Sequence, residues 1–255
     1  MRVLDSDRRV RALLNDEVVL DSRHPALVFE TGFPVGFYGF PASDFAEGVL
    51  RESIEPRQGS GFDFHAPKGA VSTWYDIVVG DRVARHAAWT LADAPELVIA
   101  SWDPGLIDRW MEEDEIVRAH PRDPFHRVDA LASSRRVTIS IGEDVVADSR
   151  NPVLVFETNL PTRYYLPVAD VDLDKLSPAA GESVCAYKGT ADRYWDSAVD
   201  PDLRGVAWSY TSPDPSVAAI AGRIAFYDEL VDVAIDGVAQ PRPVSPFSAK
   251  EQRPV

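Results

Sequence analysis

The segment Cys185-Ala186-Tyr187-Lys188-Gly189 brings a thiol and an amine together, with two residues between them on a predicted bend. A cation beside a cysteine favours the nucleophilic thiolate, so Cys185 or Lys188 could do covalent or acid–base chemistry. The competing interpretation is a small buried hydrophobic residue, the usual state of an unreactive cysteine. A Cys–His dyad would need both halves of the chain at one site, because all five histidines lie within the first 126 residues: His24, His65, His86, His120 and His126.

A second set of residues could line a pocket for a small metabolite. Tyr and Trp combine apolar area with a polar group, and basic side chains can hold the polar part of a ligand. The alternative is that the rings fill the core of a small β domain. Neighbouring rings such as Tyr194 and Trp195 point to opposite faces of a strand, so we expect some rings to face a pocket, a partner or solvent. The expected ligand-binding residues are Arg163, Tyr165, Tyr187, Lys188, Trp195, Trp208 and Tyr210.

Metal and nucleotide chemistry find little support in the sequence. After residue 126 there is one cysteine and no histidine, which excludes a Cys-rich zinc site there. Residues 170–174 resemble the start of a calcium loop, but Lys175 stands where glycine is needed, so we interpret them as a charged strand edge with Val171 and Leu173 facing inward. Neither a GxxxxGK[ST] loop nor a GxGxxG motif is present. We expect no metal and no cofactor.

The candidate residues lie in a chain that repeats itself. Residues 21–31 (DSRHPALVFET) recur at 148–158 (DSRNPVLVFET), and 148 − 21 gives an offset of 127. Shorter blocks follow in the same order: 65–69 with 185–189, 74–76 with 194–196, and 88–89 with 207–208. Ordered self-similarity of this extent indicates two copies of one structural unit. The shared pairs Arg23/Glu30 and Arg150/Glu157 are each predicted to form a semi-buried ion pair.

Alternating apolar residues predict that these copies are built from strands. Val137, Ile139 and Ile141 alternate with polar residues, and a turn at 142–144 predicts a hairpin. More strands are expected at 154–156, 192–199, 206–210, 223–227 and 231–235. A short helix is expected from Asp103, through Pro104, to Trp110.

We therefore predict a mostly β fold, with two tandem small domains and few short helices. The first copy is expected at 1–118, a proline-containing linker at 119–134, the second copy at 135–240 and a flexible tail at 241–255. We expect the two copies to pack against each other within the chain.

Composition limits the partners and the compartment. Lys plus Arg is 26 and Asp plus Glu is 41, so the net charge of −15 disfavours nucleic acid and anionic membrane surfaces. Cys185 is the only cysteine, which excludes an intramolecular disulfide. No apolar signal core follows Met1, and no apolar run is long enough for a membrane span. A cytoplasmic protein is expected.

Several motifs of the second copy resemble a bacterial family. They are Glu157-Thr158-x-Leu160-Pro161-x-Arg163-Tyr164-Tyr165-Leu166-Pro167, residues 185–189, Ala207-Trp208-x-Tyr210 and Ile224-Ala225-Phe226-Tyr227. Over nearly its whole length the sequence is similar to the domain-of-unknown-function family numbered 427. The resemblance implies a β-tent fold, related in shape to Mss4-like domains, and no established activity. A nucleotidyltransferase label sometimes attached to the family has no support in these residues.

The first copy departs from the pattern at four positions. Gly36, His65, Pro67 and Leu91 stand where the second copy has Arg163, Cys185, Tyr187 and Tyr210. The second copy is therefore the better candidate for a site. We expect it to bind a small metabolite in a ring-lined pocket; the alternatives are an enzyme that uses Cys185 or Lys188, and a protein-interaction module without catalytic chemistry.

Overall fold

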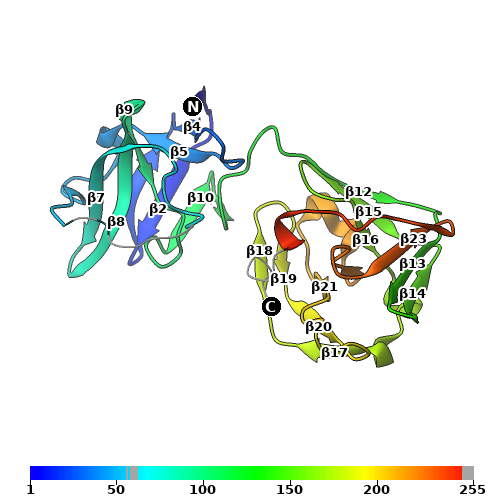
Figure 1. Cartoon of the computed structure of the whole chain (residues 1–255). Coiled ribbons are helices and arrows are strands. Elements are labelled where there is room, and N and C mark those ends of the chain that lie inside the picture. The colour runs from blue at the N-terminus through cyan, green and yellow to red at the C-terminus, as the bar shows by residue number, and fades with distance from the viewer. Residues whose placement is uncertain (56, 58–62, 249–255) are drawn as a thin grey trace. The chain divides into compact units, whose positions relative to one another are not determined.

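The computed structural model describes residues 1–55, 57 and 63–248, and the chain divides into two compact units, Met1–Asp123 and Pro124–Val255 (Figure 1). In the described residues both units consist mainly of antiparallel strands joined by turns, which confirms the predicted mostly β fold. The helical segments are short 3-10 turns: η1 (Ala42–Asp44), η2 (Val168–Asp170), η3 (Leu173–Lys175), η4 (Pro215–Ile220) and η5 (Pro246–Ser248).

The described part of the first unit holds two sheets. One has seven strands in the order β1-β4-β5-β9-β8-β7-β6, and the other has four in the order β11-β10-β2-β3. One core joins residues of both sheets, with Trp89, Tyr38 and Phe40 among its largest fully buried side chains. The strands are β1 (Arg2–Asp5), β2 (Val10–Leu14), β3 (Glu17–Ser22), β4 (Ala26–Phe29), β5 (Phe37–Phe40), β6 (Leu50–Glu52), β7 (Val71–Val79), β8 (Arg82–Leu91), β9 (Ala94–Ala100), β10 (Arg109–Glu112) and β11 (Glu115–Val117).

The described part of the second unit holds smaller sheets, in the orders β12-β15-β16, β14-β13-β23-β24 and β17-β20-β21-β22, with a β18-β19 hairpin. A bridge between Leu166 and Ile224 links the first and third of these sheets. The strands are β12 (Val128–Ala132), β13 (Val137–Ile141), β14 (Asp144–Ser149), β15 (Val153–Glu157), β16 (Arg163–Tyr165), β17 (Leu176–Ala179), β18 (Ser183–Cys185), β19 (Gly189–Ala191), β20 (Arg193–Ser197), β21 (Ala207–Ser209), β22 (Ile224–Phe226), β23 (Asp232–Ile235) and β24 (Val238–Ala239).

Two separate cores of the second unit explain its adjacent rings. Tyr165 and Tyr194 lie in a core with Trp208 and Tyr210, whereas Tyr164 and Trp195 pack against a different core built on β13 and β23. The alternation of side chains along a strand is as predicted. Tyr164 and Trp195 are only partly buried, and Tyr164 lines a pocket. Each face of the strand has a core of its own.

The strand registers also correct the alignment of the two copies. Leu27 pairs with Tyr38 and Leu154 with Tyr164, so Tyr38 corresponds to Tyr164. By the same register Phe37 corresponds to Arg163, and Gly39 to Tyr165. The predicted match of Gly36 with Arg163 is therefore wrong by one residue, because the turn before β5 is one residue longer in the first copy. A shift of one residue exchanges the two faces of a strand.

The helix expected after Asp103 is absent. The Asp103 side chain accepts a hydrogen bond from Gly105 N at 2.8 Å, and its carbonyl accepts one from Ile107 N at 3.0 Å, which forms a single turn. Trp110 then lies in β10, where it pairs with Ala12 and is 3% exposed. Burial of Trp110 in a sheet outweighs the local capping signal. The acidic segment 170–174 also differs from the prediction, since it runs through η2 and η3 and leaves Leu173 exposed while Val171 is buried.

Ordered structure extends into both segments that were predicted to be irregular. Strand β12 lies inside the range 119–134 and pairs with β15, as β1 pairs with β4 in the first unit. In the described part of the tail, Arg242 Nη2 lies 3.0 Å from Asp232, and the Phe247 ring lies 5.7 Å from that of Tyr227. Residues 241–248 thus contribute contacts to the second unit.

Candidate functional site

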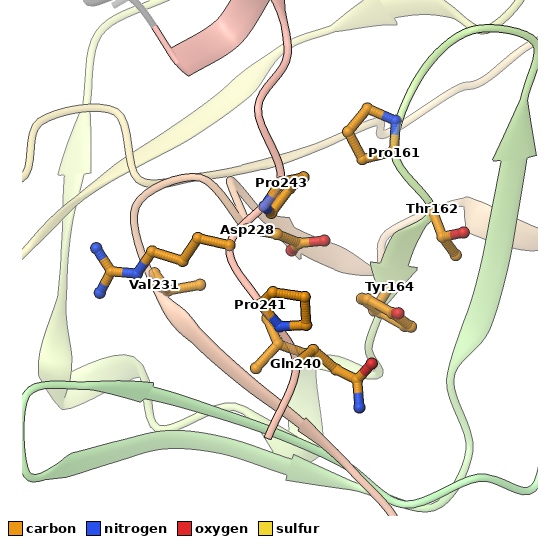
Figure 2. A pocket seen from close by; sticks show the side chains of 10 residues that line it. Pro161, Thr162, Tyr164, Asp228, Val231, Gln240, Pro241 and Pro243 are labelled. Atoms are coloured by element: carbon orange, nitrogen blue, oxygen red, sulfur yellow. The ribbon is translucent and has the colours of Figure 1, made fainter. Parts of the chain in front are cut away.

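A small pocket of the second unit lies beside the strand that carries Arg163 (Figure 2). Its volume is about 190 Å³. The walls come from the start of β16, the turn after β22, and the segment that follows β24. Its lining includes Pro161, Thr162, Tyr164, Asp228, Gln240, Pro241 and Pro243.

Asp228 is the acidic group on the wall of this pocket, which Arg242 also lines. It is 6% exposed, and Figure 2 shows its carboxyl group pointing toward the side where Thr162 and Tyr164 lie. The cation nearest to it is Arg163, whose Nη1 lies 3.8 Å away, beyond hydrogen-bond distance. Within the described chain no hydrogen bond reaches the carboxylate. Burial raises the pKa of Asp228 to about 7, because it outweighs the opposing effect of Arg163.

The remaining walls combine rigid apolar surface with a few polar groups. Three prolines, Pro161, Pro241 and Pro243, line the pocket, and their nitrogens carry no hydrogen-bond donor. The Tyr164 ring packs against the core below, and burial followed by the charge of Asp228 raises the pKa of its hydroxyl. The Gln240 side-chain amide donates to Val238 O at 2.9 Å.

Arg163, a predicted ligand anchor, is not among the residues that line this pocket. It is 7% exposed and makes two hydrogen bonds of 2.7 Å to the Glu229 carboxylate. Its guanidinium also lies 5.5–5.8 Å from the ring centres of Trp208, Tyr227 and Phe247. Two of its five N–H donors are held by Glu229, and its charge reaches the pocket through Asp228, 3.8 Å away.

The predicted ring residues do not form one wall. Tyr165, Trp208 and Tyr210 are buried in the same core, where Trp208 Nε1 donates to Tyr165 Oη at 3.2 Å. Trp195 packs against the other core. Tyr187 stacks on His126, with ring centres 4.2 Å apart.

The other predicted residues, Cys185 and Lys188, join a second polar cluster. The Lys188 ammonium donates to Glu157, and His126 Nε2 lies 3.1 Å from the other Glu157 oxygen. Burial lowers the pKa of Lys188, but its interactions with Cys185 and Glu157 outweigh burial and hold this pKa above its usual value. Burial raises the pKa of Glu157, but its interactions with His126 and Lys188 outweigh burial, so the pKa of Glu157 is lowered. Cys185 is only partly buried. We call this set the Cys185 cluster.

The Cys185 cluster corrects two sequence-based interpretations. His126 belongs to the unit that contains Cys185, so a histidine is present without help from the first unit. The ion pair expected between Arg150 and Glu157 is wrong, because the partners of Glu157 are Lys188 and His126 while Arg150 is exposed. Both copies contain a Lys-Gly dipeptide, and this repetition was the sequence signal for Lys188 as the partner of Glu157.

Sequence reasoning missed Asp228, Glu229 and His126. Asp228 and Glu229 follow the apolar strand 224–226 after one residue, Tyr227, and adjacent carboxylates just past a buried strand are unusual enough to have marked a site. His126 lies in the proline-containing segment that was assigned to a linker. Among the described residues no group of three or more His, Cys, Asp or Glu side chains could hold a metal ion.

The repeated strand pairings, with one pocket and one polar cluster in the second copy, define a protein of two tandem, mostly β domains. The chain belongs to the family described as Domain of unknown function (DUF427), whose model matches residues 2–100 and 129–237. No curated protein matches the chain significantly. In the described residues, no helix has both the length and the apolar character needed to cross a membrane.

Proposed function

We propose that the second unit binds a small metabolite that presents hydrogen-bond donors, such as a protonated amine, to Asp228. The observation behind this proposal is a buried carboxylate on a pocket wall that no hydrogen bond of the described chain satisfies. Only solvent or a ligand in the pocket can donate to this carboxylate, so a ligand that supplies donors takes the place of water there.

The size and the walls of the pocket restrict the ligand. A volume of about 190 Å³ is below the range of roughly 300–1,000 Å³ that is common for drug-sized ligands, so the ligand is small. Prolines offer apolar contact without competing donors, and Thr162 and Tyr164 offer hydroxyl groups. A compact aliphatic or cyclic amine fits these properties better than a nucleotide or a peptide.

The first prediction concerns Asp228→Asn. Small amines at about 100-fold their dissociation constant are expected to raise the melting temperature of the second unit by about 5–10 °C. The rise should be larger above a pH of about 7, where Asp228 is ionised, than below it. Asp228→Asn should abolish the rise, whereas Asp202→Asn, at an exposed aspartate, should preserve it. An equal rise in Asp228→Asn would sink the proposal.

A second candidate function is thiol chemistry at the Cys185 cluster. The observation that favours it is a partly exposed cysteine beside a buried ammonium, with His126 on the same carboxylate as that ammonium. A neighbouring cation stabilises a thiolate, and a histidine within reach can move a proton. This arrangement suits attack on an electrophilic carbon of a small substrate.

The second prediction is that Lys188→Met slows alkylation of Cys185 by iodoacetamide near neutral pH by about tenfold, because the cation beside the sulfur is lost. Cys185 is the only cysteine, so the rate reports on one thiol. Lys175→Met removes a lysine that pairs with Asp144 far from any thiol and should leave the rate unchanged. If Cys185 of the native protein reacts no faster than global unfolding allows, this second candidate is excluded.

A further inference from the structure

Residues 241–248 supply one wall of the Asp228 pocket, and we call this segment the strap. It follows β24 and contributes Pro241, Arg242 and Pro243 to the lining, together with Tyr164 and Asp228 from the body of the unit. Figure 2 shows the strap running past Asp228, with Pro241 and Pro243 beside it. The shape of the pocket therefore depends on where the strap lies.

The strap is held to the second unit by its side chains. Three of its eight residues are prolines, which have no N–H group to donate. In the described chain, no main-chain hydrogen bond joins the strap to the rest of the unit, and the last one before it runs from Gln240 N to Val233 O, at 2.8 Å. A segment with so few main-chain hydrogen bonds opens at low free-energy cost. The strap can thus leave its place while the sheets stay folded.

Two side chains near the end of the strap fix it, and we call Ser245 and Phe247 the latch. The Phe247 ring centre lies 5.7 Å from that of Tyr227 and 5.8 Å from the Arg163 guanidinium. The Ser245 hydroxyl donates to the Glu229 carboxylate and accepts from Phe247 N at 3.0 Å. This local turn orients the ring toward the core, so the two contacts form and break together.

The latch and the pocket share one group of charges. Glu229 Oε1 accepts a hydrogen bond from Ser245 and another from Arg163, and Arg163 also lies 3.8 Å from Asp228. A ligand that donates to Asp228 lies in the same space of about 190 Å³ that Pro241 and Pro243 line. Its apolar part is removed from water only while the strap is docked.

From these contacts we propose that the strap closes the amine site: it docks through the latch over a ligand held by Asp228, and it opens to release that ligand. This inference rests on the proposed binding of an amine at Asp228. A ligand that prefers the closed strap stabilises it, and loosening the strap weakens the ligand by the same factor, because the coupling between two equilibria is reciprocal.

The third prediction measures opening of the strap in the full-length protein by cleavage after Phe247. Chymotrypsin takes an aromatic side chain into its own pocket, so it cuts here only when Phe247 has left Tyr227. The rate at which the peptide 248–255 is released, followed by mass spectrometry, then reports the open fraction. Saturating cyclohexylamine, a protonated ring amine at about pH 8, should slow this release about fivefold.

Ser245→Asp opens the latch, because it places a second carboxylate against Glu229. Without amine it should speed the release of 248–255, and it should weaken cyclohexylamine binding in calorimetry by up to the same factor of about five. Val244→Asp is the matched control, since it adds the same charge at a side chain that is 94% exposed, and it should change neither quantity. If Ser245→Asp does not fold, Ser245→Ala, which only removes the hydrogen bond, should act in the same direction.

The outcomes separate the strap from the amine site. Cyclohexylamine that binds without slowing the release of 248–255 overturns the strap and leaves the proposed function standing. Equal affinity for cyclohexylamine in the wild type and in Ser245→Asp, with faster release in the variant, also overturns the strap. If neither cyclohexylamine nor other small amines bind the wild-type protein, the proposed function and the strap fail together.

Discussion

Replacing Arg163 by methionine is expected to lower the free energy of unfolding of the second unit by about 3–5 kcal/mol, because it leaves buried carboxylates without their cation. The Glu229 side chain is 1% exposed and accepts both guanidinium hydrogen bonds, and Asp228 lies 3.8 Å from the same group. The contacts of the guanidinium with Trp208, Tyr227 and Phe247 are lost as well.

The measurement is unfolding of the full chain, followed by calorimetry and by hydrogen exchange of amides in each unit. Amides of the second unit should lose protection while those of the first unit keep theirs. Arg136→Met is the matched control, since Arg136 makes a similar two-point contact with Asp148 on the surface and should cost much less. The double variant Arg163→Met with Glu229→Met should recover part of the loss. A loss no greater than in Arg136→Met would contradict a buried role for Arg163.

Local patterns were sufficient to predict several strands of the second unit, but not β12, β16, β17, β18, β19 or β24. The hairpin of Val137–Ile141 and Asp144–Ser149 forms as expected, because alternation along the strand coincides with burial on one face. The expected strands at 192–199, 206–210, 223–227 and 231–235 are each present in shortened form. Periodicity succeeds here since each strand carries its own pattern of buried side chains.

Alignment of the two copies depended on the position of one extra residue before β5 in the first copy. The sequence alone did not determine this position. Phe37-Tyr38 matches Tyr164-Tyr165 well by residue type, yet the backbone pairs Tyr38 with Leu27 and Tyr164 with Leu154. Similarity of side chains favours one register, whereas the hydrogen bonds between strands require the other. The difference places Tyr165 of the second copy at the position of Gly39 in the first copy.

The candidate site was harder to predict because its parts are distant in sequence. Arg163 meets Glu229 across 66 positions, and His126 meets Glu157 across 31. Residue types pointed correctly to Lys188 and Cys185 as neighbours, but no local pattern relates Asp228 to Thr162 and Tyr164. Such contacts arise only when β16, β22 and the segment after β24 come together.

The stability of the second unit is expected to fall as the pH rises from about 4 to about 7, through Asp228. In the unfolded chain an aspartate loses its proton near its ordinary pKa of 3.8, whereas in the folded unit the pKa is about 7. Between these values the folded state holds one more proton than the unfolded state, so raising the pH favours unfolding. At about 1.4 kcal/mol for each pH unit, the full effect is on the order of 4 kcal/mol.

Asp228→Asn isolates this contribution, because asparagine has nearly the same shape and does not ionise. The variant should match the wild type at about pH 4 and exceed it in unfolding free energy at about pH 8, by up to about 4 kcal/mol. Glu157 and Glu229 act in the opposite direction, since their pKa values are lowered and their stabilising effect is lost only below about 4.5. The pH range in which these two glutamates affect stability therefore lies mostly below the range for Asp228. Both glutamates also remain in the Asp228→Asn variant, so their effect is common to the two proteins. Parallel curves of unfolding free energy for the two proteins from pH 4 to 8 would show that the pKa of Asp228 is not raised. The proposed binding of hydrogen-bond donors at this carboxylate would then lose its support.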